Sequence, residues 1–200
     1  MEHLYNRQKN LHLDIDQSIC VIGAGGIGYW VCKYAALTGI STIHVFDPDI
    51  LEETNLNRID VPLSFIGKNK ADVAKIAVSV IRPYCDIISY PFKFQSVTNP
   101  GVKWIIDCTD NFASQIENQK IANESGSSYI KSGYDGESFS INESVAEWGE
   151  VVDGYQITPS WVVPASIVAA LTIAKIVKYN EYEVASNIKS LMTNRGNNNG

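Results

Sequence analysis

The chain alternates short apolar runs with longer segments in which apolar residues recur every three or four positions. The first pattern predicts buried strands and the second predicts helices. The expected strands fall at residues 18–22, 41–46, 87–90, 104–108 and 128–131. The expected helices cover residues 27–37, 70–81, a more polar 112–123, and 164–179, which is apolar on nearly every side. Such alternation predicts an α/β, Rossmann-like fold with a mostly parallel sheet flanked by helices.

The second half of the chain is less regular. The apolar pattern weakens over residues 137–150, where we expect a short antiparallel extension of the sheet. With 200 residues, 45% of them hydrophobic, the chain is long enough for one domain with a sizeable core. We place this domain at residues 1–183 and a C-terminal segment at 184–200. The Asn- and Gly-rich end of that segment is expected to be disordered.

Charge and composition restrict the partners. The 16 Lys and Arg residues against 22 Asp and Glu give a net charge of -6, which argues against nucleic-acid binding. The amino terminus lacks the apolar core of a secretory signal, so a cytoplasmic location is expected. Residues 154–174 carry no charge, but Pro159 and Pro164 interrupt them, so no membrane span is predicted.

The four cysteines are Cys20, Cys32, Cys85 and Cys108, far apart and without a C-x-x-C pair. This spacing suggests neither a disulfide framework nor a zinc site. We expect four structural thiols and no zinc.

A glycine-rich turn with the sequence GAGGIG follows the first expected strand at residues 23–28. Its backbone N–H groups and the helix that follows can approach a phosphate closely. The glycines of this G-x-G-x-x-G pattern are Gly23, Gly25, Gly26 and Gly28. Asp47 stands 19 residues after Gly28 at a strand end, where a carboxylate can accept hydrogen bonds from ribose hydroxyls. A tight turn beside an exposed Asp is the simpler alternative.

Polar residues that a hydrophobic core does not explain follow this turn. Asn55 and Arg58 belong to the sequence NLNR, and Lys70 comes later; a solvated loop is the alternative for each residue alone. Asp110 comes directly after an expected strand, at the edge where open α/β sheets bind ligands. A carboxylate there can hold Mg²⁺ against phosphate oxygens, although it can also cap the next helix.

Five motifs occur together in one order: YNRQ at 5–8, GAGGIG at 23–28, DPDILEETNLNR at 47–58, GKNKADVAK at 67–75 and DCTDN at 107–111. With these motifs the chain resembles the adenylyltransferase family of the MoeB and ThiF proteins and the ubiquitin-activating enzymes. The resemblance covers roughly residues 5–125. It implies that the domain at 1–183 binds ATP and Mg²⁺. It also implies transfer of AMP to the C-terminal carboxylate of a ubiquitin-like or sulfur-carrier protein, or of a ribosomal peptide, with release of pyrophosphate.

The resemblance also implies roles for individual residues. Asp47 would bind the ATP ribose and Asp110 would coordinate Mg²⁺. Arg7 would reach into the site of a partner subunit in a homodimer. The residues implied to contact phosphates are Asn55, Arg58 and Lys70.

The chain departs from this family at several points. Many relatives carry paired zinc-binding cysteines and a later cysteine that forms a thioester, and this chain has neither, so no enzyme thioester is expected. Gln115 stands where many relatives have Arg. Two alternatives stay open: an NAD-dependent oxidoreductase, which leaves NLNR and YNRQ unexplained, and a degenerate module that binds a nucleotide or a tail without catalysis. The sequence assigns no contact to Lys131 or Tyr134.

Overall fold

A seven-stranded sheet forms the centre of the protein, as seen in a computed structural model that describes residues 3–145 and 159–192. The strand order is β3-β2-β1-β4-β5-β6-β7. The first five strands in this order are parallel, and β6 and β7 add antiparallel pairs at one edge. The strands are β1 (Ser18–Ile22), β2 (Thr42–Phe46), β3 (Asp86–Tyr90), β4 (Trp104–Asp107), β5 (Ser128–Tyr134), β6 (Ser138–Asn142) and β7 (Val184–Asn187).

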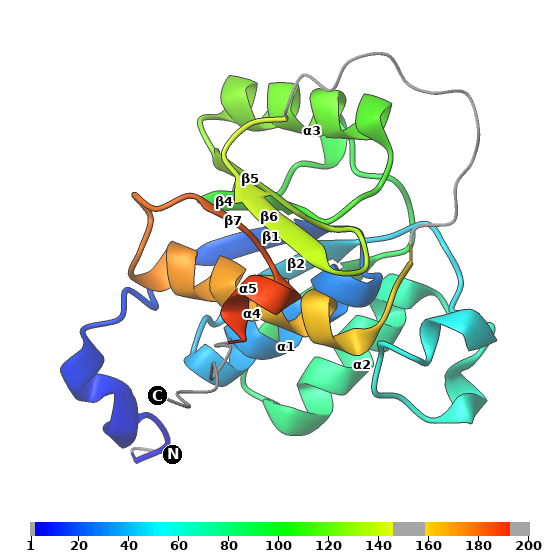
Figure 1. Cartoon of the computed structure of the whole chain (residues 1–200), viewed down its shortest axis with the longest axis horizontal. Coiled ribbons are helices and arrows are strands. Elements are labelled where there is room, and N and C mark those ends of the chain that lie inside the picture. Colours follow the sequence, from blue (N-terminus) through cyan, green and yellow to red (C-terminus); the bar gives the residue numbers. More distant parts are fainter. Residues whose placement is uncertain (1–2, 146–158, 193–200) are drawn as a thin grey trace, which may run out of the picture.

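Helices cover both faces of the sheet (Figure 1). One face carries α3 (Phe112–Ser125), and the other carries α1 (Gly26–Thr38), α2 (Lys70–Ile81), α4 (Val162–Val177) and the short α5 (Ile188–Leu191). Short 3-10 turns are η1 (Asn6–Leu11), η2 (Glu53–Asn55), η3 (Leu63–Phe65) and η4 (Ser96–Thr98). The arrangement confirms the predicted Rossmann-like fold with an antiparallel extension.

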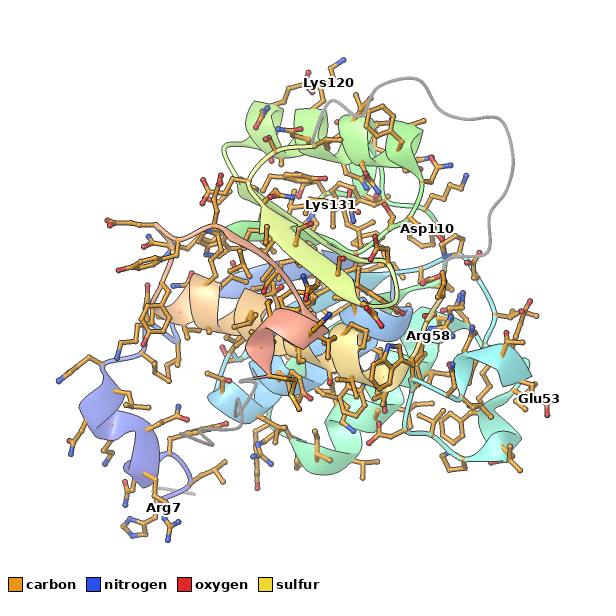
Figure 2. The ribbon with its side chains drawn as sticks, viewed as in Figure 1. Arg7, Glu53, Arg58, Asp110, Lys120 and Lys131 are labelled. Carbon is orange, nitrogen blue, oxygen red and sulfur yellow. The ribbon has the colours of Figure 1, made fainter. Side chains whose placement is uncertain are left out.

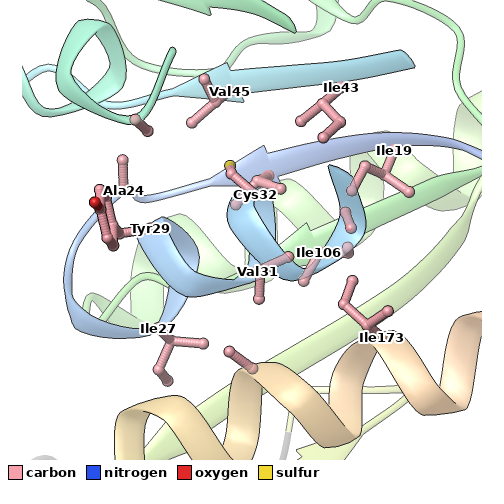
Figure 3. Packing of buried hydrophobic residues seen from close by; sticks show 14 of the residues in the cluster. Ile19, Ala24, Ile27, Tyr29, Val31, Cys32, Ile43, Val45, Ile106 and Ile173 are labelled. Atoms are coloured by element: carbon pink, nitrogen blue, oxygen red, sulfur yellow. The ribbon is translucent and has the colours of Figure 1, made fainter. Parts of the chain in front are cut away.

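The larger of two hydrophobic clusters lies between the sheet and the α1–α4 pair (Figure 3). Ile27 and Val31 of α1 and Ile173 of α4 belong to it, and each is at most 5% exposed. This packing fixes α1 against β1, because apolar surface removed from water contributes roughly 25 cal/mol per Å². The amino-terminal end of α1 is thereby held at the carboxyl edge of the parallel strands.

Most predicted elements agree with the structure, although many boundaries are shifted by one or two residues and β5 is longer than predicted. β4 ends at Asp107 rather than residue 108, and β5 continues to Tyr134 rather than ending at residue 131. The last long helix starts at Val162 rather than Pro164, because proline is tolerated within a first helical turn.

The antiparallel edge was only partly anticipated. Residues 146–150 of the stretch in which the extension was expected lie outside the described residues, as does the predicted disorder at residues 193–200. β7 was not predicted, and it pairs with β6 just beyond residue 183. The domain boundary at that residue stays a prediction.

Among the helices in the described parts of the chain, none is both long and apolar enough to cross a membrane.

Candidate functional site

The turn between β1 and α1 can be formed only with glycines at two of its positions. A Cβ atom added to Gly28 would lie 1.8 Å from the carbonyl oxygen of Gly23, far inside any real contact. Gly23 itself has φ +88, a left-handed conformation that other residues rarely adopt. Its N–H donates to the carbonyl of Phe46 at 2.8 Å, which joins the turn to the end of β2. The glycine turn therefore brings the start of α1 against the sheet edge.

The first turn of α1 is open to a ligand. Gly25 precedes the helix as its N-cap residue, and no side chain caps the N–H groups that follow. A Cβ atom at Gly25 would meet no heavy atom within 4 Å. The unpaired N–H groups and the positive end of the helix dipole favour an anion at this position. The open position is at Gly25, whereas a Cβ atom at Gly26 would lie 2.9 Å from both Arg58 and Tyr134. The approach of a phosphate to this turn stays a prediction.

Asp47 holds the glycine turn in place. Its Oδ2 accepts the N–H of Ala24 at 2.6 Å, and its Oδ1 accepts the N–H of Asp49 at 2.8 Å. Burial raises the pKa of the Asp47 carboxyl, while these two backbone hydrogen bonds and the nearby Lys70 ammonium oppose the rise. The side chain is buried, so the simpler alternative of an exposed Asp at the strand end is wrong. The contact of Asp47 with a ribose stays a prediction.

Arg58 lies over the start of α1. A Cβ atom at Gly26 would come within 2.9 Å of the Arg58 Cδ atom, so the absence of a side chain there makes room for the arginine. The Nη1 atom of Arg58 donates to the Thr54 carbonyl at 2.8 Å and to Oδ1 of Asn57 at 2.9 Å. The guanidinium is therefore held beside the open helix end, where the family resemblance places a phosphate.

Asn55 shapes the loop that carries Arg58. Its Oδ1 accepts the Glu52 N–H at 3.0 Å, and its carbonyl accepts the Arg58 N–H at 3.1 Å. Within residues 3–145 and 159–192, the Asn55 side-chain nitrogen forms no hydrogen bond. Asn55 thus stabilises the loop through its oxygen atoms and keeps an N–H group available to a ligand.

Lys70 reaches the same edge through a second loop. Its backbone N–H donates to the carbonyl of Asp49 at 2.9 Å, and its Nζ pairs with the Asp49 carboxylate at 3.1 Å. Asn69 caps α2 by accepting the N–H groups of the two helical residues after Lys70, and its own N–H₂ donates to the Asp47 carbonyl at 2.8 Å. This cap places Lys70 close to Asp47.

Asp110 follows β4 and is exposed at the carboxyl edge. The alternative that it caps the next helix is wrong, because Asn111 is the cap and accepts the Ser114 N–H at 2.9 Å. In the described part of the chain, the Asp110 carboxylate forms neither a hydrogen bond nor an ion pair. Mg²⁺ is commonly held by one or two carboxylates together with substrate phosphates, and a free carboxylate at this edge fits that donor set.

A buried carboxylate that the sequence analysis missed supports the Asp110 loop. Asp107 is 0% exposed and accepts four hydrogen bonds, two from Thr109 at 2.9 and 2.6 Å and one each from Asn118 and Tyr129, both at 2.9 Å. Gln115 donates to the Thr109 carbonyl at 2.8 Å. Gln115 therefore orders the loop, and its side-chain amide is hydrogen-bonded within the protein. The DCTDN sequence was the available signal for Asp107.

Two residues of β5 also belong to this region. A Cβ atom at Gly26 would lie 2.9 Å from the hydroxyl of Tyr134, so this hydroxyl shares the start of α1 with Arg58. Lys131 pairs in register with Asp107, and the Asp110 carboxylate is among the acidic groups that act on its amine. Burial lowers the pKa of the Lys131 amine, while Asp107 and other nearby acidic groups oppose that change. Lys131 and Tyr134 therefore add polar groups to the carboxyl edge of the parallel strands.

Arg7 lies away from these residues. It is exposed on η1, and Figure 2 shows it at the opposite end of the molecule from Arg58 and Asp110. Hydrogen bonds from Tyr5 to the Ala36 carbonyl at 3.3 Å and from Gln8 to the Thr38 carbonyl at 2.6 Å hold η1 on the end of α1. Arg7 therefore does not join the site of its own subunit.

The cysteines are unsuited to nucleophilic chemistry. All four are free thiols, and Cys20 and Cys32 are fully buried. Burial raises the pKa of Cys85 to about 11 and of Cys108 to about 12. Because the thiolate is the reactive form, this raised pKa disfavours a nucleophilic role for the Cys108 thiol beside the site. Within residues 3–145 and 159–192, no three His, Cys, Asp or Glu residues gather as a metal cluster.

The order of the strands and the glycine turn define the chain as a Rossmann-like α/β protein whose polar groups meet at the carboxyl edge of the sheet. The sequence profile of the ThiF family matches residues 6–197. The chain therefore belongs to the ThiF family.

Two curated relatives show what this chain is similar to. The adenylyltransferase and sulfurtransferase UBA4 of Eremothecium gossypii is 37% identical over 98 residues, which cover 46% of this chain and 22% of that protein. The tRNA threonylcarbamoyladenosine dehydratase of Haemophilus influenzae is 38% identical over 100 residues, which cover 46% of this chain and 38% of that protein. In both cases the match spans well under two thirds of the relative.

Among solved structures, Escherichia coli MccB has a similar fold. The TM-score is 0.73 with 18% sequence identity, and the match covers 88% of this chain and 64% of the MccB chain. MccB has been solved with ATP and also with AMPCPP and MccA. At this identity the likeness establishes the fold.

Two alanine substitutions in the glycine turn should separate folding from ligand binding. Gly28→Ala places a methyl group against the Gly23 carbonyl and should lower the free energy of unfolding by at least about 3 kcal/mol. Gly25→Ala meets no protein atom, so its stability should stay within about 1 kcal/mol of wild type, but the methyl group obstructs a nucleotide and should weaken ATP binding by about tenfold or more. Urea denaturation and calorimetric titration with ATP and Mg²⁺ measure the two effects. A Gly28→Ala variant of wild-type stability, or a Gly25→Ala variant of wild-type affinity, contradicts this assignment.

Proposed function

We propose that this protein is an adenylyltransferase that uses ATP to activate the C-terminal carboxylate of a ubiquitin-like or sulfur-carrier protein, or of a ribosomal peptide. The observation that carries the proposal is the position of Arg58, held over the open amino terminus of α1 within a ThiF-family chain. The name of UBA4 and the structures of MccB with ATP and with MccA support the nucleotide and the kind of acceptor.

The proposed reaction requires little acid–base chemistry from the protein. A terminal carboxyl group has a pKa of about 3.5, so the acceptor is already ionised at neutral pH. One carboxylate oxygen forms a bond to the α-phosphorus of ATP, and the bond from that phosphorus to the bridging oxygen breaks. Pyrophosphate leaves with the bonding electrons, and an acyl adenylate remains. The protein must mainly overcome the repulsion between two anions.

The positions of the charged side chains suit this task. The turn at residues 23–28 would receive the nucleotide, and Asn55, Arg58 and Lys70 would contact its phosphates. Asp47 would accept hydrogen bonds from the ribose through lone pairs that its two backbone contacts leave available. Asp110 would hold Mg²⁺, which supplies positive charge next to the phosphates when bound. Fixed cations in such a site stabilise the charge that develops on the phosphate oxygens.

The acceptor would not pass through an enzyme thioester, because Cys20 and Cys32 are buried and the partly buried Cys85 and Cys108 have raised pKa values. One relative is named for a tRNA modification, but the net charge of -6 disfavours a nucleic-acid acceptor. A protein or peptide tail is the acceptor that these observations favour.

A homodimer would complete the proposed site, with Arg7 supplied by the partner subunit. The position of Arg7 far from its own Arg58 supports this arrangement (Figure 2). An apolar groove of about 360 Å³ lies next to η1, lined by Leu11, Leu13, Tyr34, Leu37, Ile173 and Val177 among others. Burial of this surface by a second copy would stabilise the dimer.

A non-catalytic tail-binding module is the second candidate. It is favoured by Gln115, whose amide is bonded to the Thr109 carbonyl where many relatives have Arg. This candidate predicts normal ATP binding without pyrophosphate exchange across the whole acceptor panel described below. Formation of any acyl adenylate rejects it.

Arg58→Ala and Lys70→Ala should each slow adenylation by roughly two orders of magnitude, because each removes a cation from the transition-state phosphate. The measurement is ATP–pyrophosphate exchange with a panel of ubiquitin-like carrier proteins and peptides that end in a free carboxylate. Lys68→Ala is the matched control, since Lys68 lies on the same loop with its ammonium over the Phe65 ring and should leave the rate unchanged. Lack of ATP binding by the folded wild-type protein would defeat the proposal.

Mixed dimers test the role of Arg7 in a partner's site. Arg7→Ala and Asp110→Ala proteins should each be nearly inactive alone, but their mixture should recover roughly a quarter of wild-type activity. This share is expected because about half of the dimers are mixed and each mixed dimer has one intact site. Pyrophosphate exchange, together with native mass spectrometry to verify subunit exchange, gives the readout. Mixed dimers without recovered activity would show that Arg7 does not act across the interface.

A further inference from the structure

Asn57 joins Arg58 to a distant part of the chain. Its side-chain Oδ1 accepts the Arg58 Nη1 hydrogen at 2.9 Å, and its Nδ2 donates to the Ser160 carbonyl at 2.7 Å. Ser160 precedes α4 and lies 103 positions from Asn57 along the sequence. The exposed Asn57 side chain thus connects the Arg58 guanidinium, which is proposed to contact ATP, with the segment that leads into α4.

Ser160 has a second contact with the same region. Its hydroxyl forms a hydrogen bond with the hydroxyl of Tyr134 on β5. The Tyr134 hydroxyl and the Arg58 side chain lie against Gly26 from two sides, since a Cβ atom there would be 2.9 Å from each. Ser160 therefore contacts, directly or through Asn57, both side chains that cover the start of α1.

The chemistry of these contacts requires an amide at position 57. Arg58 needs an acceptor and the Ser160 carbonyl needs a donor, and an asparagine side chain offers one of each. A carboxylate would satisfy the arginine but would face the carbonyl without a proton to donate. An apolar side chain would satisfy neither.

The second acceptor of the guanidinium shows what Asn57 adds. Arg58 also donates to the Thr54 carbonyl at 2.8 Å, within the same short loop, and its backbone carbonyl accepts the Trp30 Nε1–H of α1 at 2.8 Å. The bond from Asn57 to Ser160 ties that loop to the segment before α4. Helix α4 in turn packs on α1. The Trp30 contact anchors the backbone of Arg58 to α1, and the Asn57–Ser160 bond fixes the side-chain oxygen that the guanidinium binds.

We propose that Asn57 is a positioning residue that holds the Arg58 guanidinium over the amino terminus of α1 by linking its Nη1 atom to the Ser160 carbonyl. This inference rests on the proposed function, in which Arg58 contacts the phosphates of ATP. Asn57 acts only through Arg58 and touches no substrate itself.

A double-mutant cycle measured by calorimetric titration with ATP and Mg²⁺ tests the inference. Asn57→Ala should weaken ATP binding by roughly tenfold, because a misplaced arginine loses part of a charge-assisted hydrogen bond. Its affinity for adenosine, which has no phosphate, should not change. In an Arg58→Ala background, Asn57→Ala should cause no further loss, since a residue that acts through Arg58 has nothing left to position.

Ser160→Ala is the matched control. It removes the hydroxyl that contacts Tyr134 but keeps the carbonyl that Asn57 uses, so its ATP affinity should stay within about threefold of wild type. The inference is overturned if Asn57→Ala binds ATP normally, if its loss adds in full to that of Arg58→Ala, or if Ser160→Ala is as weak as Asn57→Ala. A folded wild-type protein that binds no ATP would instead defeat the proposed function.

Discussion

The close approach of α1 to the end of β1 is the constraint on which the rest of the site depends. The carbonyl of Gly23 occupies the space that any side chain at position 28 would need. Because Asp47 and the Phe46 carbonyl bind the N–H groups of this turn, the approach also fixes the turn relative to β2. The start of α1, whose first N–H groups have no side-chain cap among the described residues, is therefore held in a fixed position relative to the loops around it.

Three segments bring their polar groups to the start of α1. The loop after β2 contributes Asp47 and Arg58, the start of α2 contributes Lys70, and the loop after β4 contributes Asp110. Within a chain of net charge -6, the cations at this edge are held by oxygen atoms of the protein. Exposed pairs of this kind contribute no more than about 1 kcal/mol, so a phosphate can replace them at small cost. The cations of the site can therefore exchange their present partners for an anion at small energetic cost.

The sequence predicts those features that are local. Parallel strands buried on both faces appear as continuous apolar runs, which is why β1, β2 and β4 were placed to within a residue. The bounds of α2 were also predicted, since apolar residues recur along it at helical spacing and Pro83 follows its end. β7 was missed because it is a short, half-exposed edge strand whose pairing with β6 leaves no apolar run.

The features of the site that could not be predicted depend mainly on contacts between residues far apart in the sequence. The four hydrogen bonds to Asp107 come from three different elements, and the Asn57–Ser160 bond spans 103 positions. Side-chain identity alone does not show such partners. The motif set indicated which residues approach a nucleotide, whereas the structure adds the residues that hold them in place.

The central claim is that the glycine turn and its surrounding cations select ATP rather than a nicotinamide dinucleotide. Calorimetric titration of the wild-type protein with ATP plus Mg²⁺ and, separately, with NADH tests this claim most directly. The account predicts clear binding of ATP and weak or undetectable binding of NADH. Tighter binding of NADH would contradict it and would favour an oxidoreductase.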